Sequence, residues 1–144
     1  MISFREQYKN QIKNLADKMQ KETMPALTEK LFALFETTGK RLAYENVYFT
    51  RRKFLAVFGL AAYIFRRMED VTKLEEVLWE ICEEECWALP AHVNRKDNPD
   101  WQNTVDLFAA ETAQAMAEII TLVNEKIPKE YHLSDGVCQQ VKKK

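Results

Sequence analysis

The spacing of hydrophobic residues predicts helices along most of the chain. Near the N-terminus, apolar residues recur at steps of three and four, as one stripe of a helix requires. This first stripe consists of Phe4, Tyr8, Ile12, Leu15 and Met19. We expect the helix to cover residues 3–22, because Ser3 followed by Glu6 three residues later is the capping-box pattern of a helix start.

Two further helices are predicted before residue 68. Pro25 is compatible with the first turn of a second helix, which should end where Gly39 supplies a left-handed residue. A third helix over residues 44–67 is apolar on more than one face, so we expect it to be central. Gly59 lies inside this helix, where glycine costs about 1 kcal/mol relative to alanine, and it therefore indicates a close helix crossing.

The second half of the chain predicts two more helices around one long loop. Residues 71–86 form an amphipathic pattern whose wet face includes Glu84, and residues 104–124 form an alanine-rich helix that Thr104 could cap. Residues 87–103 lie between them and are longer than an ordinary connection, which is typical of functional loops. The expected architecture is all-α, with about five helices over residues 1–128 and a frayed tail at 129–144.

Composition supports the helical prediction and narrows the range of partners. The chain has only three glycines and four prolines in 144 residues, too few for the turns of a β-protein. Its net charge of −1 lacks the basic excess of nucleic-acid binders, and its longest apolar run is shorter than the roughly 20 residues of a membrane span. We therefore expect no nucleic acid and no membrane as partners. Three cysteines fit reduced thiols in a cytoplasmic protein.

The long loop and the helix after it contain the residues best suited to chemistry. His92 lies in the loop, where it could act as an acid or base, or simply bond a backbone carbonyl. Asp106 and Glu111 interrupt an apolar segment, so Glu111 should either pair with an arginine such as Arg41, Arg51 or Arg52 or face a cavity. Trp87 and Trp101 flank the loop and could stack on sugars.

Other polar clusters have both a functional and a structural interpretation. Cys82 and Cys86 with His92 and Cys138 could form a zinc site, but the CxxC spacing is absent, and small core thiols fit better. We expect no metal and no cofactor. The basic residues at 51–53 and 66–67 could attract an anion, although a solvated helix face explains them as well. Trp79, on a helix face, is expected in the core.

Three stretches of the sequence form recognisable motifs. They are TGKR through YE to YFTRR at residues 38–52, LWEIC followed by CWALPAH at 78–92, and DLFAAETA at 106–113. With their spacers they cover roughly residues 25–124. Together they resemble the N-terminal (α/α)-toroid of heparinase II/III-like polysaccharide lyases. The Trp-x-Leu-Pro-Ala-His element and the Asp-Leu-Phe-Ala-Ala-Glu-Thr element are fairly specific in combination.

The resemblance implies a fold in which about five helices form antiparallel hairpins as part of an (α/α) toroid. It also implies a reaction. Such lyases cleave uronic-acid polysaccharides by β-elimination: one group neutralises the C5 carboxylate, a base removes the C5 proton, and an acid protonates the departing O4. By resemblance His92, Asp106 and Glu111 would line the cleft, with His92 as the catalytic candidate. The candidate substrate-binding residues are Trp87, Asn94, Trp101, Asp106 and Glu111.

Three functional hypotheses follow. The first is a fragment of a lyase toroid that is not catalytic alone, because the later toroid segments and the β-sandwich domain of the family have no counterpart in this sequence. Its partner would be an acidic polysaccharide or oligosaccharide. The second is a non-catalytic helical scaffold or protein-interaction domain. The third is an enzyme whose cleft is completed by homo-oligomerisation through uncovered apolar helix faces.

Overall fold

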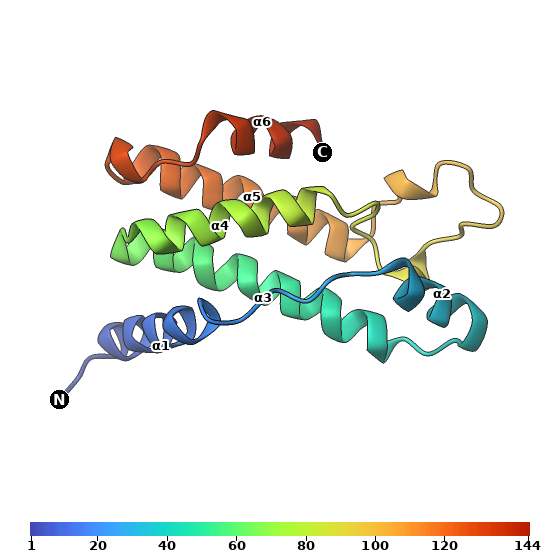
Figure 1. Ribbon diagram of the computed structural model, residues 1–144, viewed down its shortest axis with the longest axis horizontal. Coiled ribbons are helices and arrows are strands. Elements are labelled where there is room, and N and C mark those ends of the chain that lie inside the picture. The colour runs from blue at the N-terminus through green and yellow to red at the C-terminus, as the bar shows by residue number, and fades with distance from the viewer.

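The computed structural model describes residues 1–144 and contains six α-helices and no strand (Figure 1). The α-helices are α1 (Phe4–Met19), α2 (Glu29–Thr38), α3 (Leu42–Phe65), α4 (Met68–Cys82), α5 (Leu107–Lys126) and α6 (Asp135–Lys143). Three short 3₁₀ turns are η1 (Pro90–His92), η2 (Trp101–Asn103) and η3 (Lys129–Tyr131). The predicted all-α class is confirmed.

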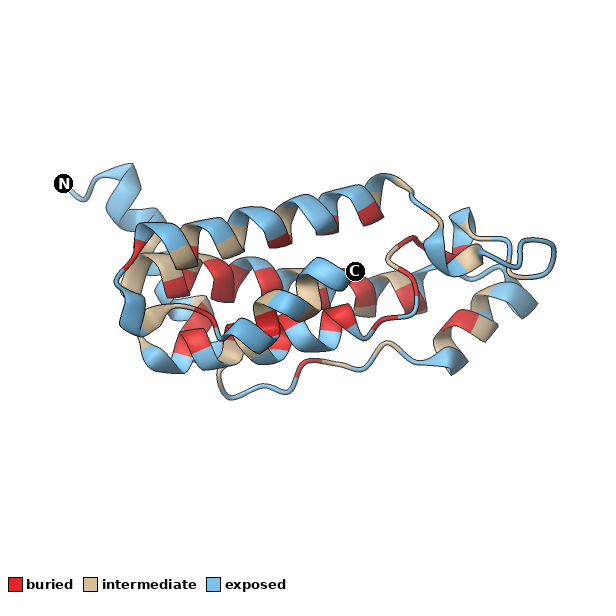
Figure 2. Cartoon of the chain, turned by 90° about the horizontal axis from the view of Figure 1, so that it is seen from above, coloured by how far each residue is buried: buried red, intermediate tan, exposed pale blue.

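Helix α3 is the centre of the fold. It is the longest helix, with 24 residues, and it contacts α1, α2, α4 and α5. A two-residue link reverses the chain after α3, so α4 runs antiparallel to it, and α6 packs on α4 (Figure 1). The buried residues lie along the faces that these helices turn toward one another (Figure 2). Burial of this shared apolar surface is the main stabilising contribution.

Most helix boundaries agree with their sequence signals. The Glu6 N–H donates to Ser3 Oγ at 3.2 Å, so Ser3 caps α1 as predicted. Gly39 has φ of +71° and ends α2, which confirms the predicted left-handed stop. The prediction for Pro25 is wrong: α2 begins four residues later, where Thr28 Oγ1 accepts the Leu31 N–H at 3.3 Å. A side-chain cap at Thr28 satisfies an N–H group that Pro25 could not.

The glycine inside α3 marks the predicted close crossing. A Cβ atom added at Gly59 would lie 2.6 Å from Cδ1 of Ile119 on α5. The two helices therefore approach closely at this point because one of them has no side chain there. Thr104 does not cap α5 as expected; Asp106 does, with its Oδ1 accepting the Ala109 N–H at 2.7 Å.

The C-terminal segment is ordered, in contrast to the frayed tail expected over residues 129–144. Ser134 caps α6 through its Oγ, which accepts the Val137 N–H. Val137 is buried in the main core, and Cys138 and Val141 pack against that core. The apolar stripe is only two turns long, which is why its periodicity is weak in the sequence. None of the helices combines the length and the hydropathy that crossing a bilayer requires.

Candidate functional site

His92 and Asp106 meet where the long loop joins α5. His92 ends the 3₁₀ turn η1, and its Nδ1 lies 2.6 Å from Asp106 Oδ2. The Asp106 side chain is only 9% exposed, whereas the His92 side chain is 42% exposed. An ionised Asp106 can only accept a hydrogen bond, so Nδ1–H is the donor and Nε2 is left as the free ring nitrogen. The pair thus fixes both the tautomer and the orientation of the imidazole.

Asp106 holds three groups at once. Its Oδ2 also accepts the Leu89 N–H at 3.0 Å, and its Oδ1 caps α5 through the Ala109 N–H. Burial alone would raise the pKa of Asp106. The hydrogen bonds from His92, Leu89 and Ala109 outweigh that effect, so the pKa of this carboxyl is lowered. Asp106 is therefore charged at neutral pH and keeps the loop, the imidazole and the helix start together.

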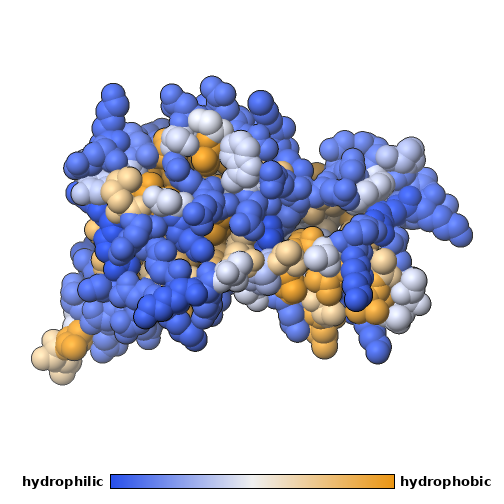
Figure 3. Space-filling model, in the orientation of Figure 1, coloured by the Kyte–Doolittle hydropathy of each residue, from blue (hydrophilic) through white to orange (hydrophobic).

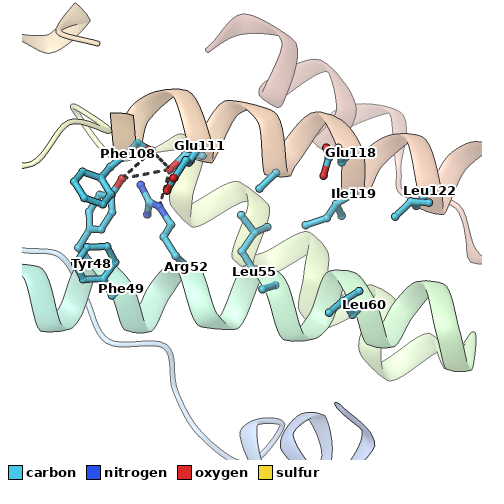
Figure 4. Close-up of a pocket in the computed structure, with 13 residues that line it drawn as sticks. Tyr48, Phe49, Arg52, Leu55, Leu60, Phe108, Glu111, Glu118, Ile119 and Leu122 are labelled. Carbon is cyan, nitrogen blue, oxygen red and sulfur yellow. Dashed lines mark hydrogen bonds between the residues drawn. The ribbon is translucent and has the colours of Figure 1, made fainter. Parts of the chain in front are cut away.

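The His92 ring contacts a residue that lines a groove between α3 and α5, although His92 itself is not part of the lining. It stacks on Phe108, with ring centroids 6.2 Å apart and planes 7° apart, and Phe108 lines the groove (Figure 4). The groove has a volume of about 350 Å³, and nine of its thirteen lining residues are hydrophobic. Its aromatic end holds Tyr48, Phe49 and Phe108. Glu111 also lines it and makes no ion pair, so of its two predicted roles the structure favours the cavity-facing one.

The arginine at the aromatic end of the groove is already neutralised. Arg52 binds Glu84 through both Nη atoms, each 2.8 Å from a carboxylate oxygen. Its Nε donates to Thr112 Oγ1, and its guanidinium lies 3.9 Å from the centroid of the Tyr48 ring. Burial would lower the pKa of Arg52, but the Glu84 carboxylate raises it above its ordinary value. Arg52 therefore lines the groove as a fixed, hydrogen-bonded side chain, and its charge is already paired.

A second arginine completes a buried cluster around the same carboxylate. Arg51 Nε donates to Glu84 Oε1 at 2.7 Å, and its other nitrogens donate to the carbonyls of Pro25 and Glu80. The side chains of Arg51 and Glu84 are each only 4% exposed. Both sequence interpretations of Arg51 and Arg52, an anion site and a solvated face, are therefore wrong. Glu84 was expected on the wet face of its helix and is buried instead.

The structure does not bring the remaining candidate residues to this groove. The Trp87 indole donates to the Ile81 carbonyl, and its ring packs against the main core. Trp101 contacts Phe32 in a smaller core cluster. Asn94 is exposed and bonds only Asp97 within the loop.

Two residues of the groove and its network escaped the sequence analysis. Tyr48 is buried, and its hydroxyl donates to the Trp87 carbonyl at 2.6 Å, which ties α3 to the loop. Burial raises the pKa of Tyr48 above its ordinary value. Phe108 lies between His92 and the groove. The one available signal was the aromatic spacing around residues 44–49 on a predicted central helix. Trp79, expected in the core, is 41% exposed and donates to Glu83 instead.

The cysteines behave as small core residues. Burial raises the pKa of Cys82 to about 11 and also raises the pKa of the Cys86 thiol. Cys86 donates to the Trp101 carbonyl, and Cys138 accepts from Asn124. Nowhere do three His, Cys, Asp or Glu side chains gather in a way that could hold a metal ion.

Comparison with known proteins adds no family to this picture. The chain matches no protein-family model, and it matches no curated protein. The structure itself defines the class of protein. It is an all-α protein in which a histidine–aspartate pair lies beside a groove with aromatic residues at one end.

Proposed function

We propose that the chain is part of a helical polysaccharide lyase of the heparinase II/III-like type and contributes half of its site. The observation that carries the proposal is the 2.6 Å contact between His92 Nδ1 and Asp106 Oδ2, which leaves Nε2 exposed beside aromatic rings. An imidazole held in this way is suited to accept a proton. Aromatic rings such as Phe49 and Phe108 offer flat apolar faces to a sugar ring.

In the proposed reaction His92 Nε2 takes the C5 proton of a uronate residue. The electron pair of the broken C–H bond forms the C4–C5 double bond, the C4–O4 bond breaks, and an acid returns a proton to O4. A cation must neutralise the carboxylate for the C5 proton to become acidic. Arg52 is the cation at this end of the groove, and it is occupied by Glu84. We therefore propose that this chain binds an acidic saccharide but does not complete the reaction alone.

Imidazole NMR tests the binding step, because the chain has only two histidines. Uronate oligosaccharides from heparin, alginate or pectin should shift the signals of His92 on titration. His132 serves as the internal control, since it bonds the Ile127 carbonyl beyond the far end of α5. A neutral oligosaccharide of equal length should shift neither histidine. Unmoved His92 signals at saturating uronate, or equal shifts with the neutral sugar, would contradict the proposal.

A second experiment tests the missing cation. Incubation with the same uronate polymers should give no rise in the ultraviolet absorbance of the unsaturated product. Measurable elimination by the wild-type chain that His92→Ala abolishes would show that the site is complete and that the half-site proposal is wrong. Elimination that survives His92→Ala would remove His92 from the mechanism.

One observation favours a second candidate, a non-catalytic helical interaction domain. Asp106 also caps α5 and holds the Leu89 N–H, so its contact with His92 could serve only to fasten the loop. The two functions differ in one measurement. The interaction domain requires no saccharide response at His92, whereas the lyase fragment requires one.

A further inference from the structure

Two apolar surfaces of this chain have no partner within it. The first is the start of α1, which protrudes from the body and is exposed on all sides (Figure 2). Phe4 is 83% exposed and Tyr8 is 44% exposed, although both continue the stripe whose later residue Ile12 is buried. Hydrophobic residues are visible at this end of the molecule, at the lower left of Figure 3. An apolar stripe that is buried at one end and exposed at the other indicates that the exposed end binds another surface.

The second surface is the far half of the groove between α3 and α5. Beyond Arg52 the lining changes from aromatic and polar to aliphatic, with Leu60, Ile119 and Leu122 (Figure 4). Aliphatic side chains offer no hydrogen bonds to a saccharide, so this half requires a different occupant. It lies on the side of the α3–α5 pair away from α4, and Figure 4 shows α4 behind it.

The charges of the two surfaces are complementary. On α1 a basic residue directly follows each of the first three residues of the apolar stripe, at Arg5, Lys9 and Lys13. On α5 two carboxylates line the groove, at Glu111 and Glu118, and neither forms an ion pair within the chain. Glu111 and Glu118 are seven residues apart and lie on one face, about 10 Å along the helix. A helix with an apolar row and an adjacent basic row therefore matches an apolar groove with an acidic rim.

We propose that this chain forms a two-fold dimer in which the start of α1 of each copy occupies the aliphatic half of the α3–α5 groove of the other. Phe4 and Tyr8 enter the groove, while Arg5 and Lys9 reach Glu111 and Glu118. Because every copy carries one arm and one groove, a reciprocal exchange satisfies both and closes the assembly at two chains.

A charge swap tests this pairing. In one variant, Arg5→Glu with Lys9→Glu makes the arm acidic; in the other, Glu111→Lys with Glu118→Lys makes the groove basic. Each variant alone brings like charges together, so its dimer dissociation constant should rise about tenfold or more. Mixed in equal amounts, the two variants match at both contacts, and a one-to-one heterodimer should return. Arg5, Glu111 and Glu118 are exposed and Lys9 is half-buried, so the folds should survive, which circular dichroism checks.

Analytical ultracentrifugation reads the outcome. A wild-type chain that stays monomeric up to its solubility limit overturns the proposal. Variants that dimerise as tightly as wild type, or a mixture that stays monomeric, overturn it as well. Phe4→Ala with Tyr8→Ala should weaken the dimer about tenfold or more, whereas Leu42→Ala, which removes an apolar side chain exposed elsewhere, should not. The readout is independent of saccharide binding at His92, so this proposal and the lyase proposal fail separately.

Discussion

Glu84 and Asp106 are hydrogen-bonded near the two ends of the loop between α4 and α5, but their partners differ in exposure. Glu84 is buried and holds two arginines, whereas Asp106 holds a half-exposed histidine and two backbone N–H groups. The buried carboxylate is paired with two arginines, so its main role is to hold the fold together. Asp106 is itself only 9% exposed, but it leaves one partner, His92, open to solvent. The two carboxylates thus differ in the exposure of their partners. Buried partners indicate a structural network, whereas an exposed histidine indicates a candidate site.

The largest effect is expected from Glu84→Gln. The variant leaves Arg52 without its counter-charge and Arg51 with only Glu80, 3.6 Å away, and breaking a buried pair typically costs about 3–5 kcal/mol of unfolding free energy. Urea denaturation followed by circular dichroism measures this loss. Glu85→Gln, on the exposed neighbour, is the matched control and should change stability by less than about 0.5 kcal/mol. A loss below about 1 kcal/mol for Glu84→Gln would mean that the cluster is not structural.

A smaller loss is expected from Asp106→Ala. The variant removes the cap of α5, worth about 1–2 kcal/mol, and frees the Leu89 N–H as well. Thr104→Ala is the control and should be nearly neutral, because Thr104 does not cap the helix. The same denaturation experiment compares them. Equal losses in the two variants would place the helix start at Thr104 after all.

The pH dependence of stability should show the lowered pKa of Asp106. Its folded pKa lies below the unfolded value of about 3.9, so its contribution is fully present above that value and is lost as pH falls through the folded pKa. Wild type should therefore exceed Asp106→Asn in stability at neutral pH, and the gap should narrow below about pH 4. A gap that stays constant with pH would show that the charge of Asp106 contributes nothing.

The smallest effect on stability is expected from His92→Ala. A partly exposed hydrogen bond contributes at most about 1 kcal/mol, and Asp106 keeps its two backbone bonds in the variant. The unfolding free energy should therefore fall by less than that amount, while any saccharide binding is lost. A stability loss as large as that of Asp106→Ala would make His92 a structural residue and would favour the interaction domain.

The sequence predicted those features of the fold that depend on local chemistry. Helix periodicity, the Ser3 cap, the left-handed Gly39 and the close crossing at Gly59 are all encoded within a few residues or by one missing side chain. The helix start near residue 25 was wrong because Pro25 and Thr28 are both acceptable starts, and only Thr28 supplies a side-chain cap.

The candidate site was predicted in part. His92 and Asp106 were both singled out, but their 2.6 Å contact could not be foreseen, since the path of the loop between them decides it. Glu84 was misplaced for a related reason. It lies in a run of three glutamates whose members look equivalent in the sequence, and only the turn after α4 points this one at Arg51 and Arg52.

The same loop has a consequence for the integrity of the chain. Arg95 anchors its middle to α2 through Glu29 and Glu36, but the next residues, from Lys96 to Asp100, are exposed and bond mainly one another. Exposed loop tips are preferred sites of proteolysis. A single cut after Lys96 would leave two pieces that remain associated, because α3 packs on α5 and α4 packs on α6 across the break. The cleaved protein should therefore behave as two complementary fragments that stay bound to each other.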